Sequence, residues 1–470
     1  IPWWTALLIN SPMGNKIAAG QFYFGKIHSF IRYVIFYISA KAVASVSQDR
    51  KELSIEMKAK RFTRSFTLLI LGQSSSLLGN FTLKFALSMY VLEKTGSAAV
   101  FAGLLAAAML PTILLSPFGG ILADRANRRN IMVALDVLSG LAVLTAGIAL
   151  NFWHDITVIS ILLVVLSVLS AFESPTVQAC VPQMLSGDNL VKGNAAVSQV
   201  AAVTSLITPF LGSLFYTAFG IQPIFCAVVA CFLITALLES FIQIDKPKAL
   251  PKTHAPTIIK EDFTVTTHFL RREQPGILKL LLLAALVSLF VAGTAVVGFP
   301  YLVRTVLGLS AGYYGAAESA MGAAAIAGSL CAALLAKRLR LRSLGTIFIA
   351  FGLCLLPGGI AFLLPISAIG RYAILLAVFC VCQLGCTLFS TYAISVIQAR
   401  TPEHLMGKVM SYVFTLSLCA QPLGQILYGA LFDYFSDRAH WVLIPSGLLI
   451  CAAGLASSGF FARWEQRESA

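Results

Sequence analysis

This sequence has few charged residues. Only 11% of its 470 residues are Asp, Glu, Lys or Arg, whereas 58% are hydrophobic. The mean hydropathy is +0.84. A soluble domain needs a larger fraction of charged residues, because its surface must be covered with groups that water solvates. The composition therefore excludes an ordinary soluble enzyme or binding module and predicts a membrane protein.

Several functional patterns are also missing from the sequence. There is no run of alternating ten-residue strands, so helices are expected to span the membrane. There is no Gly-x-x-x-x-Gly-Lys-Ser/Thr loop and no nucleophile elbow, which argues against an ATPase and a membrane enzyme. The ten cysteines lack nearby histidines at metal-ligand spacing. We therefore expect no catalytic residue, metal site or cofactor.

Apolar stretches of about 20 residues are typical of transmembrane helices. Twelve such stretches occur, near residues 66–90, 98–121, 130–151, 156–178, 193–216, 221–243, 277–302, 312–336, 344–364, 372–396, 408–431 and 441–462. The predicted fold is an all-α membrane protein with twelve transmembrane helices.

The basic residues are distributed unevenly between the loops. The net charge of +14 could suggest nucleic acid as a partner. If the first span runs outward, however, the outside loops hold only Lys94, Arg304, Arg371 and Arg438, and the other side holds most of the rest. Basic residues collect in cytoplasmic loops. The bias predicts a multi-pass protein of the cell membrane with both termini in the cytoplasm, and leaves no need for a nucleic-acid partner.

Residues 1–56 do not fit this pattern. They begin with Ile1, mix aromatic and basic residues, and precede Met57, which is followed by "KAKRFTR" as in a natural start. We expect residues 1–56 to be a non-native or disordered extension without a role. The alternative is an interfacial helix around residues 21–40.

The chain repeats itself. "VQACVP" (177–182) is matched by "IQARTP" (397–402), "ILADRANRRNI" (121–131) by "LLAKRLRLRSL" (334–344), and "FLGSLFY" (210–216) by "PLGQILY" (422–428). The matches keep their order and their places between spans, which predicts two pseudo-symmetric six-helix halves. The predicted domains are residues 57–243, a cytoplasmic linker at 244–276, and residues 277–470.

The stretch "GGILADRANRRNIMV" (119–133) lies between the second and third spans and holds one acid and three arginines within six positions. With the twelve spans and two halves, it resembles the major facilitator superfamily, whose signature there reads Gly-x-Leu-Ala-Asp-Arg-x-Gly-Arg-Arg/Lys. Asn127 stands where the family has glycine, and asparagine also tolerates a left-handed turn. "FESPTVQACVPQML" and "ITPFLGSLFY" are similar to the drug-exporting, macrolide-efflux-like branch.

The resemblance implies that this loop is a cytoplasmic gate. Asp124 would face the N-terminus of the eleventh span near Lys408, because a carboxylate is favoured at a helix N-terminus. The arginines would hold acids or lipid phosphates. The alternative is a topology anchor. In the second half, Lys337 stands at the position that corresponds to Asp124. We therefore expect the two halves to make different contacts at the cytoplasmic side. The expected gate residues are Gly120, Asp124, Arg125, Arg128, Arg129 and Asp136.

Polar residues recur at helical spacing in two spans. They are Gln73, Ser76, Asn80 and Lys84 in the first span, and Ser167, Ser170, Ser174 and Gln178 in the fourth. Polar stripes facing lipid are costly, so we expect them to line a wet substrate cavity between the halves. The alternative is hydrogen bonding between helices.

Lys84, Asp136, Glu173 and Glu318 are ionisable residues within the predicted spans. Because burying a charge in a membrane is costly, we expect each of them to have a functional role. Asp136 is expected to pair with the loop arginines. Glu173 and Glu318 are candidates for proton coupling. A pair between Lys84 and Glu318 across the halves is an open alternative.

The resemblance also implies helix-packing roles for Pro209 and Gly212 in the fifth span and for Pro422 and Gly424 in the eleventh. It indicates a secondary transporter that exports a drug or macrolide-like molecule against proton entry. The expected partners are a small-molecule substrate, a proton and membrane lipid, with the chain a monomer. The alternatives are export of an endogenous metabolite such as a siderophore, and a membrane sensor that keeps the fold without transport.

Overall fold

The computed structural model describes residues 64–185, 188–243, 266–335, 341–436 and 438–469. The predicted extension at 1–56, most of the predicted linker and Lys337 lie outside these residues. The contacts group residues 63–470 into one compact unit. All regular structure in the described residues of this unit is helical.

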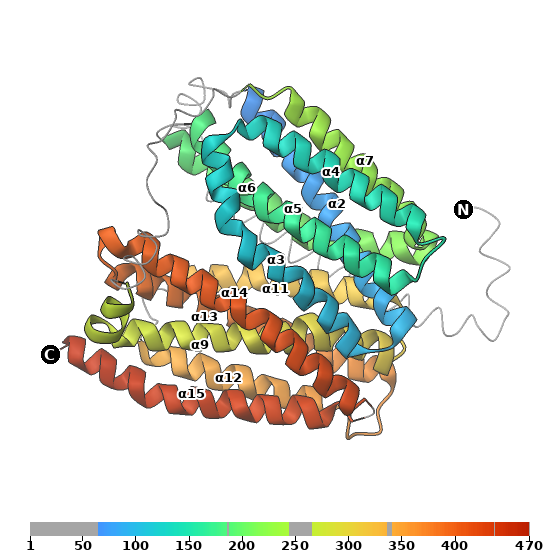
Figure 1. The fold of residues 1–470 in the computed structure, drawn as a ribbon. Helices are drawn as coiled ribbons and strands as arrows, with labels where there is room; N and C mark the ends of the chain where they lie inside the picture. The colour runs from blue at the N-terminus through green and yellow to red at the C-terminus, as the bar shows by residue number, and fades with distance from the viewer. Residues whose placement is uncertain (1–63, 186–187, 244–265, 336–340, 437, 470) are drawn as a thin grey trace, which may run out of the picture. The chain divides into compact units, whose positions relative to one another are not determined.

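Apart from the step from α7 to η1, the helices follow one another with short connections (Figure 1). The first half contains α2 (Arg64–Thr95), α3 (Ala98–Arg125), α4 (Arg128–Ala149), α5 (Asp155–Met184), α6 (Asp188–Phe219) and α7 (Ile221–Ser240). The second half contains η1 (Phe269–Glu273), α9 (Pro275–Val291), η2 (Ala292–Gly298), α10 (Phe299–Tyr301), η3 (Leu302–Val306), α11 (Ala311–Leu335), α12 (Leu341–Ile360), α13 (Ala368–Arg400), α14 (Glu403–Tyr434) and α15 (His440–Ser469).

Each predicted span overlaps one helical segment, which confirms the all-α fold class. Within the described residues, nine segments are long and apolar enough to cross a membrane. The helices at the first, eighth and eleventh predicted spans, α2, α11 and α14, are not among the nine. The count of twelve spans therefore stays a prediction.

The seventh predicted span is one continuous helical rod from Pro275 to Val306, but two of its stretches, η2 and η3, are π-helical. Pro300 lies between them. Proline has no backbone N–H and cannot complete the regular α-helical ladder, which favours such local rewinding.

The same helix pairs pack in both halves, as the sequence repeat predicts. The helix α3 packs on α5 as α11 packs on α13, and α4 packs on α7 as α12 packs on α15. Small residues allow the closest approaches: a Cβ at Gly119 would collide with the carbonyl oxygen of Ala171, and one at Gly328 would lie 2.5 Å from that of Leu384. The backbones of α3 and α5 therefore approach each other closely at Gly119.

Two helix pairs join the halves. The helix α3 runs beside α14, and α6 packs on α11 (Figure 1). We call the end of the bundle that carries the end of α2 and the start of α3 the outer end, after the predicted orientation. There Gly96, at φ 61°, makes the turn, and Ser97 Oγ caps α3 by accepting a hydrogen bond from the N–H of Val100 (3.1 Å).

Candidate functional site

The arginine loop between α3 and α4 is partly described. Arg128 donates from Nε to the carbonyl of Ala123 (2.8 Å) and from Nη1 to that of Ala179 (2.7 Å), which ties the end of α3 to α5. Asn127 has φ −69°, so the backbone there is extended rather than left-handed and does not require glycine. The structure does not describe the burial of Gly120 or the side chains of Asp124 and Arg125. The gate at this loop therefore stays a prediction.

The outer end carries an acid-to-helix contact between the halves, which we call the Asp433 cap. The Asp433 carboxylate, in the last turn of α14, accepts hydrogen bonds from the N–H of Ala98 (2.6 Å), from the N–H of Ala99 (3.2 Å) and from Ser97 Oγ. These N–H groups open α3 and have no partner within their own helix. A carboxylate there also meets the positive end of the helix dipole. The Asp433 cap thus joins α14 of one half to α3 of the other.

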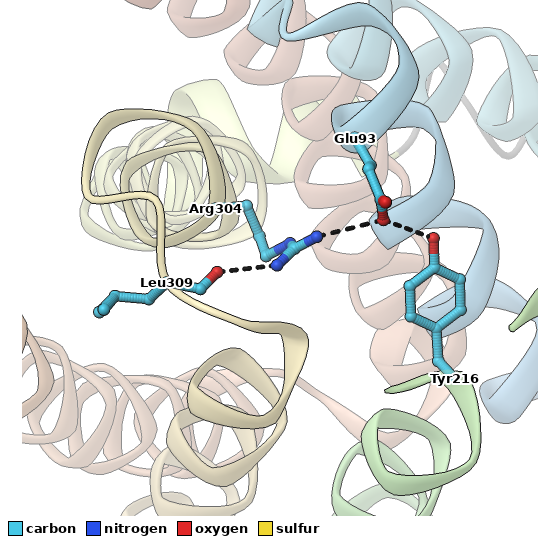
Figure 2. A network of polar contacts seen from close by, with 4 residues as sticks. All are labelled: Glu93, Tyr216, Arg304 and Leu309. Atoms are coloured by element: carbon cyan, nitrogen blue, oxygen red, sulfur yellow. Dashed lines mark hydrogen bonds and ion pairs between the residues drawn. The ribbon is translucent and has the colours of Figure 1, made fainter. Parts of the chain in front are cut away.

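A second polar contact joins the halves at the same end, and we call it the Arg304 network (Figure 2). The Nη2 of Arg304, on η3, lies 3.2 Å from Oε2 of Glu93 on α2. The same oxygen accepts a hydrogen bond from the hydroxyl of Tyr216 on α6 (2.9 Å). The Nη1 of Arg304 donates to the carbonyl of Leu309 (2.8 Å), which fixes the direction of the guanidinium.

Sequence reasoning missed both outer contacts. Arg304 was counted only as an outside basic residue, and Asp433 was not singled out. A signal existed for Asp433, since "FDYF" ends the eleventh span with an acid much as "ILAD" ends the second. Which helix such an acid would meet depends on the crossing of α3 and α14, and the sequence does not give that crossing.

Three acids of the first half meet inside the bundle, and we call them the carboxyl cluster: Asp136 on α4, Glu173 on α5 and Glu239 on α7. Ser76 Oγ, on α2, lies 3.4 Å from Oδ1 of Asp136 and 3.3 Å from Oε1 of Glu173, as donor in both contacts. Glu239 interacts with the side chains of both other acids. The cluster lies where α2, α4, α5 and α7 pack together.

Glu239 is the member that sequence reasoning missed. It lies one residue before the end of α7 and resembles an ordinary acid at a helix end, yet its exposed fraction is 0%. The absence of a side chain at Gly72 on α2 makes room for it, since a Cβ there would lie 3.3 Å from Cγ of Glu239. Thr235 Oγ1 donates to the carbonyl of Gly72 (3.1 Å) and holds the two helices together.

Two ion pairs that the sequence suggested are not formed among the described residues. Asp136 interacts with Ser76 and the other two acids rather than with the loop arginines, because the described contacts of Arg128 go to helix-end carbonyls. Lys84 lies within electrostatic reach of Glu173, and no ion pair between Lys84 and Glu318 occurs among the described residues. In both cases the acid and its neighbours lie within the first half.

The residues of the two predicted polar stripes differ in how deeply they are buried. Gln73 and Ser76, with exposed fractions of 8% and 1%, are buried at the carboxyl cluster rather than in a wet cavity. Further along the first span, Asn80 is half-buried and Lys84 is exposed. In the fourth span Ser167 is half-buried, whereas Ser170, Ser174 and Gln178 are exposed. The cavity role of these exposed residues stays a prediction.

Glu318 lies on α11, apart from the carboxyl cluster. It is half-buried, and its interaction partner is Tyr314, one turn earlier. The ring of Tyr314 stacks on Phe85 of α2 with 5.3 Å between centroids. Glu318 therefore lies beside a direct aromatic contact between the two halves.

The residues predicted to pack helices lie at close crossings. A Cβ at Gly212 would lie 3.2 Å from the ring of Phe85, and the carbonyl of Pro209 would lie 2.5 Å from a Cβ at Gly315 of α11. A Cβ at Gly424 would collide with the carbonyl oxygen of Leu289 on α9. Pro422 lies inside α14, two residues before Gly424. Their packing role in transport stays a prediction.

Comparisons with known proteins agree with this architecture. Macrolide efflux protein A of Streptococcus pyogenes is 25% identical over 390 residues, which cover 81% of this chain and 92% of that protein. Multidrug efflux pump Tap of Mycobacterium tuberculosis (strain CDC 1551 / Oshkosh) is 26% identical over 381 residues, which cover 78% and 86%.

Solved structures share the fold. A bacterial homologue of the iron transporter ferroportin in its inward-facing state has a TM-score of 0.64 at 18% identity, covering 85% of this chain and all of that one. The nucleoside transporter NupG has a TM-score of 0.66 at 12% identity, covering 85% and 99%. The sequence profile of the Major Facilitator Superfamily matches residues 69–421. The chain is thus a multi-pass membrane transporter that belongs to the Major Facilitator Superfamily.

Proposed function

We propose that this transporter exports a hydrophobic or amphipathic small molecule, drug-like or macrolide-like, in exchange for protons and by alternating access. Relatives named for macrolide efflux and multidrug efflux match at least 78% of the chain, which supports export of such compounds. The charge bias of the loops supports cytoplasmic termini, and the chain would work as a monomer.

The observation that carries the coupling proposal is the half-buried acid Glu173, which accepts a hydrogen bond from Ser76 and lies within electrostatic reach of Lys84. Ionisable groups within spans are costly and mark ion and substrate pathways. A lysine beside a carboxyl can balance its charge, and uptake of a proton by the carboxyl releases that lysine. Glu173 and Lys84 thus support a proton step within the first half, with Glu318 of the second half as the other acid that could respond to substrate.

The outer contacts support alternating access. The Asp433 cap and the Arg304 network close the outer end with side-chain contacts, which can break while every helix keeps its own backbone hydrogen bonds. In the proposed cycle, Asp124 closes the opposite end against the start of α14, and the arginines of its loop meet acids or lipid phosphates. The two ends then open in turn.

The test is transport by the full chain in liposomes with an imposed pH gradient. A macrolide and a lipophilic cationic dye serve as substrates. We expect the gradient to drive uphill movement of at least one of them, and a protonophore to abolish it. Glu173→Gln should abolish gradient-driven movement while downhill exchange survives, because glutamine keeps the shape and removes the proton site.

Glu273→Gln is the matched control, since Glu273 lies in η1 outside the long spans and faces His268. It should transport like the parent. Movement that is equally fast with and without the pH gradient would refute proton exchange. Failure of both compounds to move, in protein that is correctly folded, would refute the substrate class.

A further inference from the structure

Asp136 and Glu239 form a pair of acids that the proposed exchange at Glu173 does not yet use. Their exposed fractions are 1% and 0%, and their side chains interact with each other. Oδ2 of Asp136 and both carboxyl oxygens of Glu239 meet no donor in hydrogen-bond geometry among the described residues. The Glu239 side chain also interacts with that of Gln73, whose Nε2 likewise has no hydrogen-bond partner among the described residues.

Two carboxyl groups in contact can bond to each other only if one of them carries a proton, because an ionised carboxylate is an acceptor without a donor. Two negative charges at this range, away from water, also repel strongly, so that such a pair holds one proton between its members. The geometry is therefore that of a proton-sharing pair.

Ser76 connects this pair to Glu173. Its hydroxyl lies within 3.4 Å of both acids but has one proton to donate. When it donates to Glu173, its oxygen can accept a proton from Asp136. The hydroxyl then gives one proton and takes one, and it is neutral before and after the step.

Among the described residues, no cation is an ion-pair partner of Asp136 or Glu239. From α2 the cluster meets Gln73 and Ser76, and Lys84 lies within electrostatic reach of Glu173. From α5 it meets Cys180, whose thiol is within electrostatic reach of both Arg128 and Glu239. Glu239 lies in the last turn of α7, at the predicted cytoplasmic end.

We infer that Glu239 and Asp136 share a proton and exchange it with Glu173 through Ser76, forming a relay between Glu173 and the cytoplasmic end of α7. This inference rests on the proposed proton exchange and names its path. In the export cycle the relay returns the proton from Glu173 to the cytoplasm: Glu173 gives its proton to the Ser76 oxygen while the Ser76 hydroxyl gives its own proton to Asp136, and the pair then loses one proton at Glu239. No other reactant is needed.

The first experiment detects the shared proton without transport. Infrared difference spectra of the full chain in liposomes, recorded between alkaline and acid pH, show protonated carboxyl groups by their C=O band and its shift in D2O. We expect a band at neutral pH that Asp136→Asn and Glu239→Gln each remove. Ser76→Ala should keep it, because the pair remains intact. A band that survives both acid substitutions would overturn the inference, as would its absence from the parent.

The second experiment measures the relay. Gradient-driven export should fall at least about tenfold in Asp136→Asn, in Glu239→Gln and in Ser76→Ala, while downhill exchange survives, because proton transfer by positioned groups contributes such factors. Glu273→Gln again serves as control. Parent-like export in all three variants would overturn the relay and leave proton exchange standing. A parent that ignores the gradient would instead refute the proposed function, and the infrared band would still decide whether the pair shares a proton.

Discussion

Asp433→Asn tests the closure of the outer end most directly. The substitution keeps the size of the side chain and one acceptor oxygen but removes the negative charge that faces the start of α3. Asp433 accepts three hydrogen bonds from Ser97, Ala98 and Ala99, all in the other half of the bundle. The change therefore weakens a contact that exists only while the outer end is closed.

The size of the effect follows from the position of the carboxylate. A charge at a helix N-terminus contributes about 0.3–1 kcal/mol when exposed and up to about 2 kcal/mol when partly buried. Asp433 is half-buried, so the upper part of this range applies. A loss of about 1–2 kcal/mol changes the ratio of outer-closed to outer-open molecules by a factor of about 5–30.

Pulsed electron paramagnetic resonance can measure this ratio. Spin-labelled non-canonical residues at Trp153 and Leu363 leave the native cysteines unlabelled, and both positions are exposed, at 69% and 57%, in outer loops of opposite halves. We expect Asp433→Asn to increase the population with the longer distance between the labels.

Asp155→Asn is the matched control, because Asp155 is also an outer acid but contacts Tyr90 (2.6 Å) and Lys94 (3.4 Å) within its own half. Its distance distribution should match that of the parent. If Asp433→Asn gives the same distribution as this control, the Asp433 cap does not hold the outer end closed.

Three further changes have distinct expected outcomes. Asp124→Asn should leave membrane insertion and protein level intact but lower transport, because it weakens the proposed inner gate; parent-like transport would reduce the loop to a topology anchor. Gly424→Val should lower stability by about 1–3 kcal/mol, seen as a lower melting temperature in detergent, because its side chain collides with a carbonyl of α9. Glu93→Gln should shift the outer equilibrium less than Asp433→Asn, because the Glu93 side chain is 57% exposed and exposed ion pairs contribute at most about 1 kcal/mol; an equal or larger shift in the label distances would contradict this.

Much of the fold could be predicted from local sequence. Apolar length located the long helices, and the repeats predicted two similar halves, because each of these signals lies within a single helix or between copies of one. The polar spacing of Gln73 and Ser76 correctly placed them on one face of α2. It did not reveal which helix that face meets.

The candidate site depended on contacts that no local pattern encodes. Glu239 looked like an acid at a helix end, and it joins the carboxyl cluster only because α7 packs against both α2 and α4. Asp136 was assigned to the loop arginines by spacing along its own helix, whereas the packing of α2 brings Ser76 to it instead. Residues that meet across helices far apart in the chain need the packing to be known first.

The two outer contacts differ in how they respond to the ions of the surrounding medium. Arg304 and Glu93 form an ion pair in which the acid is largely exposed. Dissolved salt weakens the attraction within such exposed pairs, with a Debye length of about 8 Å at physiological ionic strength. The carboxylate of Asp433 is instead held by backbone N–H groups of α3 in a half-buried position, at distances as short as 2.6 Å, where screening is weak. When the surroundings of the cell change from dilute to saline, the Asp433 cap would thus change little. We expect this contact to keep the outer end closed in both media.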